Sequence, residues 1–234
     1  LQAAASISLA APLSDLRTDT RRLINETDPA NTHCTESELN SWANMWQKDL
    51  GTFLDLPRRS TRITTTVDIA TYAMPTNFIY SLEAFYDQTN AGGEIKLEEI
   101  AQSELEKIYN REWRQDASSD PFHYYFPGVE ASTLDVVGIH PPPNSANAGS
   151  NKLRIFYVAV PDTLSADGNE SQIPDIYHHT AQYYMASKCF FKIGDLPSFE
   201  RMFGLYQNTR DFYKKKIDRH QARVGTLEDE RPTR

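Results

Sequence analysis

The chain has 234 residues, of which 39% are hydrophobic and 24% charged, the composition of a globular protein. Its net charge of −8 argues against a protein that binds nucleic acid over its whole surface. The charge is uneven, because residues 201–234 carry nine Lys or Arg and five Asp or Glu, a net of +4, whereas residues 1–200 carry a net of −12. No apolar run reaches the roughly 18 residues of a membrane-spanning helix, so we expect no membrane partner.

The N-terminal part predicts an arm followed by two helices. Residues 1–12 are small and apolar and are expected to form a flexible arm. Thr35 and Glu38 have the spacing of a capping box at the start of the second helix, which ends before Pro57. The apolar side chains of that helix recur at helical spacing: Leu39, Trp42, Ala43, Trp46, Leu50, Phe53 and Leu54. Residues 13–57 are therefore predicted to form a helical hairpin.

The hydrophobic period changes after the second helix. From Thr61 to Ala73, β-branched and polar residues alternate, which predicts a strand. Further strands are expected at residues 78–87, 94–97, 122–126, 133–140 and 152–160, with a short helix at 98–109. The loop of residues 141–151 is rich in proline and too poor in apolar residues to pack, so it is expected to be a tail-facing finger or a disordered spacer.

The C-terminal part predicts a second helical hairpin. A helix begins at Pro174 and ends at Gly194, and Pro197 starts the next one. Residues 161–171 are expected to form a connecting loop, and residues 222–234 a C-terminal tail.

The predicted fold class is therefore α+β. Residues 13–57 and 172–221 form a helical bundle from the two hairpins, and residues 58–160 form a central antiparallel β insertion. The bundle is expected because a two-helix hairpin cannot bury two apolar stripes by itself.

A search for catalytic motifs finds little. No Gly-rich phosphate loop, no G-x-S-x-G elbow and no His pair at i, i+4 spacing occurs, so we expect no cofactor and no metal. His178 and His179, with Asp175, could serve a hydrolase, but a surface or interface position is the expectation for both histidines. Cys34 and Cys189 are expected to be reduced, partly buried thiols.

On the last helix, some apolar and basic side chains project away from the main apolar stripe. An apolar patch beside a basic patch predicts contact with another chain. The alternative is a broader intramolecular core with a solvated basic end. The patches consist of Leu205 and Phe212, continued by Lys216, Arg219 and Arg223. Arg210 falls inside the stripe, so we expect it to pair with a carboxylate.

Several motifs follow one another in a defined order along residues 14–192. They are Ser14-Asp15-Leu16-Arg17, Thr35 to Trp42, Thr66 to Pro75 with Asn77-Phe78, Trp113, Asp120 to Tyr125, Leu153 to Tyr157, and Ile173-Pro174-Asp175-Ile176-Tyr177-His178. In this order they resemble the head-to-tail connector proteins of tailed bacteriophages, also called adaptor, neck or head-completion proteins. The helix start "Pro-x-x-Tyr-His" is the most specific of them.

The resemblance implies a non-enzymatic virion protein of the head–tail junction, made in the host cytoplasm. Such proteins form a homo-oligomeric ring of about twelve copies beneath the portal. The ring extends the channel through which genomic DNA passes without sequence recognition, and it presents a platform to the next neck or tail protein. The implied portal or channel contacts are Arg210, Lys214, Lys215, Lys216, Arg219 and Arg223. Leu205 and Phe212 are the expected subunit interface.

Three alternatives remain open at this point. The first is a neck stopper or tail terminator, which is usually dominated by β structure. The second is a hydrolase that uses His178 or His179. The third is a receptor-binding module, which normally carries repeats or a β-rich C-terminus.

Overall fold

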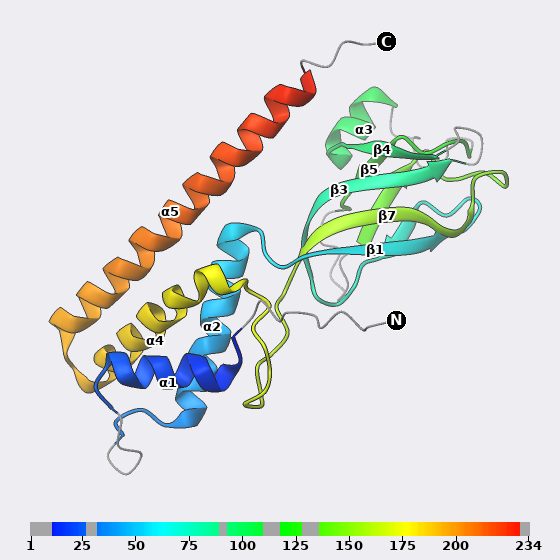
Figure 1. Ribbon diagram of the computed structural model, residues 1–234. Coiled ribbons are helices and arrows are strands. Elements are labelled where there is room, and N and C mark those ends of the chain that lie inside the picture. The colour runs from blue at the N-terminus through cyan, green and yellow to red at the C-terminus, as the bar shows by residue number, and fades with distance from the viewer. Residues whose placement is uncertain (1–10, 27–31, 89–92, 110–117, 128–135, 230–234) are drawn as a thin grey trace, which may run out of the picture. The chain divides into compact units, whose positions relative to one another are not determined.

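The computed structural model describes residues 11–26, 32–88, 93–109, 118–127 and 136–229, with the backbone alone from residue 220 onward. The chain divides into two compact units (Figure 1). Residues 1–57 and 161–234 form the helical unit, and residues 58–160 form the β unit.

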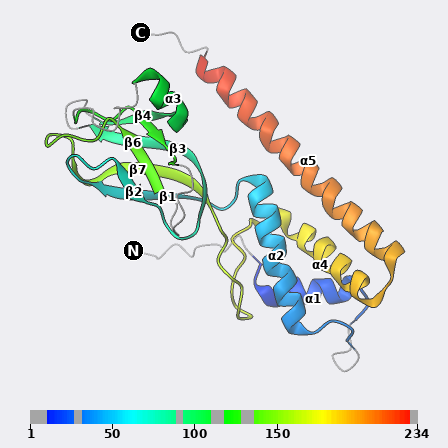
Figure 2. The same ribbon diagram turned by 180° about the vertical axis from the view of Figure 1, so that it is seen from behind.

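The described residues of the helical unit form four helices and one 3-10 turn. They are α1 (Leu13–Leu23), α2 (Glu36–Leu54), the turn Asp175–Tyr177, α4 (His178–Ile193) and α5 (Leu196–Asp229). All four helices contribute buried side chains to one core, among them Leu16, Trp46, Met185 and Tyr206. Figures 1 and 2 show α1 lying across α2, whereas α4 and α5 run antiparallel.

Local sequence signals set the ends of these helices. The capping box at α2 is confirmed: the Glu38 backbone N–H donates to Thr35 Oγ1 at 3.3 Å, and the Thr35 N–H donates to the Glu38 carboxylate at 2.8 Å. Gly194 ends α4 in the left-handed conformation, with φ of 79°. Asp195 then accepts a hydrogen bond from the Ser198 N–H at 3.2 Å and so caps the start of α5.

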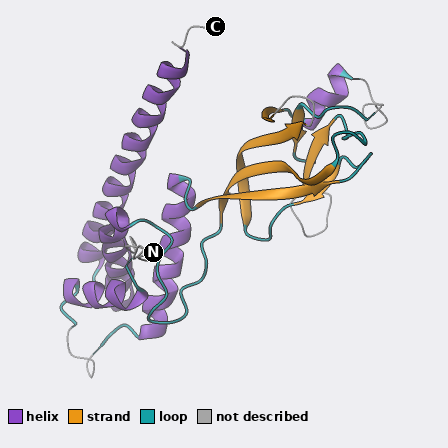
Figure 3. Cartoon of the chain, turned by 45° about the vertical axis from the view of Figure 1, so that its right-hand side comes forward, coloured by secondary structure: helices purple, strands orange, loops and turns teal. Residues whose placement is uncertain are grey.

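The β unit holds a seven-stranded sheet in its described part, with the short helix α3 (Gln102–Ile108) beside it (Figure 3). The strands are β1 (Arg58–Thr65), β2 (Thr71–Ala73), β3 (Phe78–Gln88), β4 (Gly93–Glu99), β5 (His123–Tyr125), β6 (Val136–His140) and β7 (Gly149–Ala159). Their order is β1-β7-β3-β4-β5-β6-β2. The edge strands β1 and β2 are joined by only residues 66–70, so the sheet curls until it is nearly closed.

The predicted fold class is wrong. Residues 58–160 lie between the two halves of the helical unit in the sequence, but they are not a minor β addition to a helical bundle, because their nearly closed sheet encloses a core of its own that includes Tyr86, Val137, Leu153 and Ile155. The sheet is also not purely antiparallel, since β4 and β5 pair in parallel. In the helical unit, the crossing of α1 over α2 replaces the antiparallel hairpin that was predicted for residues 13–57.

Two further expectations for the β unit are wrong. Residues 61–73 do not form one strand, because Asp68 adopts a positive φ of 61° and the chain turns between β1 and β2. The loop of residues 141–151 packs against the unit: Pro141, Pro142 and Pro143 are buried, and the Tyr86 hydroxyl donates to the Asn147 carbonyl at 3.0 Å. The loop is therefore neither a finger nor a disordered spacer.

The limits of other predicted segments differ from the observed elements. Helix α5 continues through residues 222–229, the first part of the segment predicted as a tail. Residues 1–10 of the predicted arm, 133–135 of a predicted strand and 230–234 of the predicted tail lie outside the described residues. Trp113 of the motif series lies outside them too.

Candidate functional site

The Asp49 carboxylate is a central contact between α5 and α2. Asp49 of α2 accepts a hydrogen bond from the Tyr206 hydroxyl and pairs with the Arg210 guanidinium at 3.3 Å. The Arg210 guanidinium also lies over the Phe53 ring, 4.0 Å from its centroid. Burial and the neighbouring Asp49 carboxylate raise the pKa of Tyr206, so its hydroxyl stays protonated and donates. The prediction that Arg210 pairs with a carboxylate is confirmed.

Two further contacts continue this attachment along α5. Lys214 pairs with Asp55 at 3.2 Å, just after the end of α2. One residue earlier, the Tyr213 hydroxyl donates to the Ile176 carbonyl at 3.0 Å. Arg210 and Lys214 were expected to contact a portal or a channel, but both are engaged inside the helical unit.

The other side of α5 carries the exposed residues of the predicted site. Phe212 and Leu205 expose 61% and 41% of their surface. Lys215, Lys216 and Arg219 are also exposed. Arg223 lies on α5, but its side chain is outside the described part of the structure. The exposed apolar and basic side chains therefore share a helix that is already anchored by its opposite side.

The C-terminal part of α5 extends past the other helices of its unit (Figures 1 and 2). Among the side chains described on α5, Ile217 is the last that packs against the helical core. The helix then runs on to Asp229, a distance of about 18 Å at 1.5 Å per residue. This extension is therefore suited to bind another molecule.

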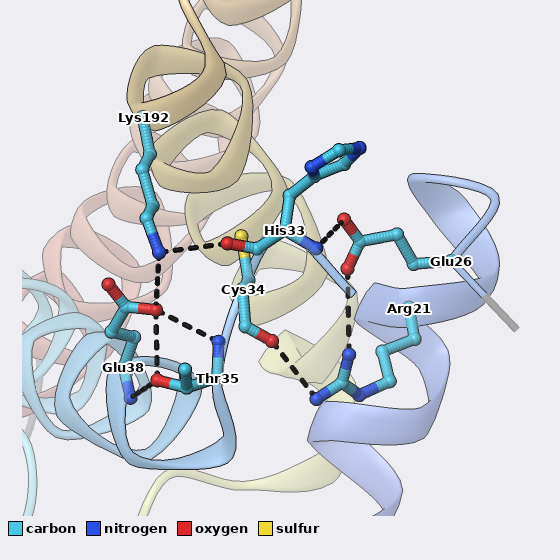
Figure 4. A network of polar contacts seen from close by, with 7 residues as sticks. All are labelled: Arg21, Glu26, His33, Cys34, Thr35, Glu38 and Lys192. Atoms are coloured by element: carbon cyan, nitrogen blue, oxygen red, sulfur yellow. Dashed lines mark hydrogen bonds and ion pairs between the residues drawn. The ribbon is translucent and has the colours of Figure 1, made fainter. Parts of the chain in front are cut away.

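A polar network holds the link between α1 and α2 against α4 (Figure 4). The Lys192 ammonium donates to the His33 carbonyl at 2.8 Å and pairs with Glu38 at 2.7 Å. From α1, Arg21 donates to the Cys34 carbonyl at 3.2 Å. Hydrogen bonds from Lys192 and Thr35 hold the pKa of Glu38 at about 2, so the carboxylate is ionised at neutral pH. The network fixes the packing from which α5 projects.

His178, for which a surface or interface position was expected, is buried inside the helical unit. Its Nδ1 accepts the Ala11 N–H at 3.2 Å and lies 3.0 Å from the Asp175 carboxylate, and its Nε2 donates to the Ile173 carbonyl at 2.7 Å. Because the Ile173 carbonyl can only accept a hydrogen bond, His178 carries its proton on Nε2. Both ring nitrogens are thus committed to structural contacts, and the geometry does not favour the hydrolase alternative. Burial lowers the pKa of His179.

The described residues were also searched for a metal site and for a membrane-spanning helix. Within them, no group of three or more His, Cys, Asp or Glu side chains could hold a metal ion. No described helix is both long and apolar enough to cross a bilayer. Sequence patterns alone predicted the exposed residues of α5. They did not predict the contact between Asp49 and Tyr206, because nothing in the sequence links these two positions.

A comparison with family models matches residues 11–228 to the SU10 adaptor protein family. The chain belongs to this family. The match covers all the helices and strands described above except Asp229, the last residue of α5, so both units are part of the adaptor and neither is an unrelated addition. No curated protein matches the chain.

Membership confirms the resemblance to phage head–tail connector proteins. The adaptor role is structural, and it implies a virion component of the head–tail junction that assembles with portal and tail proteins.

Proposed function

We propose that this adaptor forms a ring of about twelve copies that joins the portal to the neck or tail and extends the DNA channel. The observation that carries the proposal is the C-terminal extension of α5 beyond Ile217, the last described side chain that packs on the helical core. Helix α5 is anchored by one side and leaves its opposite side and its end for another chain. We infer that the portal binds this end.

The charge distribution supports the same assignment. Lys215, Lys216 and Arg219 are exposed in the second half of α5, around the point where the extension begins, and they suit an acidic portal surface. The net charge of −12 over residues 1–200 suits a channel wall, because carboxylates repel the phosphates of DNA that must slide through. DNA would then pass without sequence recognition.

Leu205 and Phe212 are our candidates for contact between neighbouring copies. Rings with cyclic symmetry need two different surfaces on each subunit, one for each neighbour. The exposed apolar side of α5 supplies one of these surfaces. Assembly on the portal would bury these side chains.

Truncation after Ile217 tests the role of the extension. We expect the truncated protein to keep its helical core and its Tm within a few degrees, and to lose portal binding. Native mass spectrometry of each protein, alone and with the matching portal ring, measures this. For the full chain we expect a monomer alone and about twelve copies on the portal. Unchanged binding by the truncated protein would refute the role of the extension.

A pair of charge variants tests whether the basic side chains of α5 contribute to portal binding, separately from the length of the helix. Lys215→Glu with Lys216→Glu should weaken portal binding at least about tenfold, because two exposed cations are reversed near the contact. Lys48→Glu with Lys107→Glu reverses two exposed cations, one on α2 and one on α3, and serves as the control with the same change in net charge. Equal weakening by the control would show a general effect of net charge. A small oligomer that ignores the portal would overturn the ring proposal itself.

A further inference from the structure

The two cysteines of the chain lie together in the core of the helical unit. Cys34 precedes α2 and Cys189 lies on α4, and their exposed fractions are 0% and 2%. Both side chains belong to the same buried core of the helical unit, and each thiol perturbs the pKa of the other, so the two are close neighbours. Both are free. The fold thus brings together two sulfur atoms that are far apart in the sequence.

Contacts of neighbouring residues hold the two cysteines close to each other. Lys192 lies one helical turn after Cys189 on the same face of α4, and its ammonium donates to the carbonyl of His33, the neighbour of Cys34. Arg21 donates to the Cys34 carbonyl itself. The segment that carries Cys34 is therefore clamped to both α1 and α4 (Figure 4).

We propose that Cys34 and Cys189 are a redox pair that closes to an intramolecular disulfide outside the reducing host cytoplasm. The physiological setting rests on the virion location of the adaptor, but the chemistry does not. With a small-molecule disulfide as oxidant, one thiolate attacks a sulfur of the oxidant and releases one thiol. The second cysteine then attacks the mixed disulfide and releases the other thiol. The protein loses two protons and two electrons, and the oxidant becomes two thiols.

The burial of the pair makes this reaction slow and gated. Burial raises the pKa of both thiols, so they are protonated in the closed structure, and the thiolate is the reactive form. An oxidant reaches Cys34 only when its segment opens. Lys192 holds that segment closed through its contacts with His33 and Glu38, so its removal should accelerate the reaction. We therefore expect the adaptor to assemble with both cysteines reduced and to become more rigid afterwards, when the disulfide forms.

The test is incubation of the full-length protein with oxidised glutathione. We expect the intact mass to fall by about 2 Da, no free thiol to remain after denaturation, and the product to run as a monomer without reductant. The Tm should rise by about 5 °C or more, because the bond closes a long loop. Lys192→Met should speed the reaction by about threefold or more. Lys188→Met, on the same helix but outside the clamp, should react at the wild-type rate.

Several results would overturn the proposal. They are retention of two free thiols by both the wild type and Lys192→Met, a stable glutathione adduct on one cysteine, or disulfides between chains. Cys34→Ser and Cys189→Ser should form no internal bond, and circular dichroism checks that each is folded. The experiment needs no portal, so its outcome is independent of the ring proposal.

Discussion

Asp49→Ala should weaken the attachment of α5 to α2 without removing it, because the Lys214–Asp55 pair remains. The substitution leaves the Tyr206 hydroxyl, on a residue that is 1% exposed, without its acceptor, which costs about 1–3 kcal/mol. It also breaks the pair with Arg210, whose side chain is 21% exposed, and this adds roughly 0.5–1 kcal/mol after solvent screening. We expect the free energy of unfolding of the helical unit to fall by about 1.5–4 kcal/mol. Urea denaturation followed by far-UV circular dichroism measures the loss.

A double-mutant cycle isolates the Asp49–Tyr206 contact. Tyr206→Phe removes the hydroxyl, so adding Asp49→Ala should then cost about 1 kcal/mol less than it does in the wild type. Asp211→Ala is the control, because this exposed carboxylate lies 3.5 Å from Arg210 Nε but contributes no acceptor to Tyr206. The reasoning fails if Asp49→Ala costs less than about 0.5 kcal/mol or if the two substitutions are additive.

Two further predictions concern Glu38 and Gly138. Because the folded-state pKa of Glu38 is lowered to about 2 from 4.5, its contribution is present above pH 4.5 and is lost as the pH falls toward 2. The stability difference between wild type and Glu38→Gln, measured by urea denaturation, should shrink over that interval. At Gly138, an added Cβ would lie 2.1 Å from the Tyr125 ring, so Gly138→Ala should destabilise the β unit by about 1–3 kcal/mol. Gly93→Ala, where the added atom has open space, should be near neutral in thermal unfolding.

Local signals in the sequence predicted many of the element ends. The capping box of Thr35 and Glu38, the left-handed Gly194 and the restart of the helix near Pro197 all depend on interactions within a few residues. Such interactions are visible in a sequence window. The exposed Leu205 and Phe212 were found in the same way, from their positions on a helix.

Long-range pairings were not accessible in this way. The parallel pairing of β4 with β5 joins Glu98 to His123, and no local pattern distinguishes it from an antiparallel pairing. His178 is buried beside the backbone of Ala11, which is 167 residues away in the sequence. The triple proline loop packs because the β unit forms a surface for it, which composition does not reveal.

The cations of α5 show why a docking surface is hard to derive from composition. Arg210 and Lys214 are four residues apart, so they lie on the same face and meet Asp49 and Asp55. Lys215 and Lys216 follow at once in the sequence, but each residue turns the helix by about 100°, which directs them away from that face. A run of adjacent basic residues is thus divided between an internal and an external role. Only the positions of the carboxylates at α2 decide which cations are left for a partner.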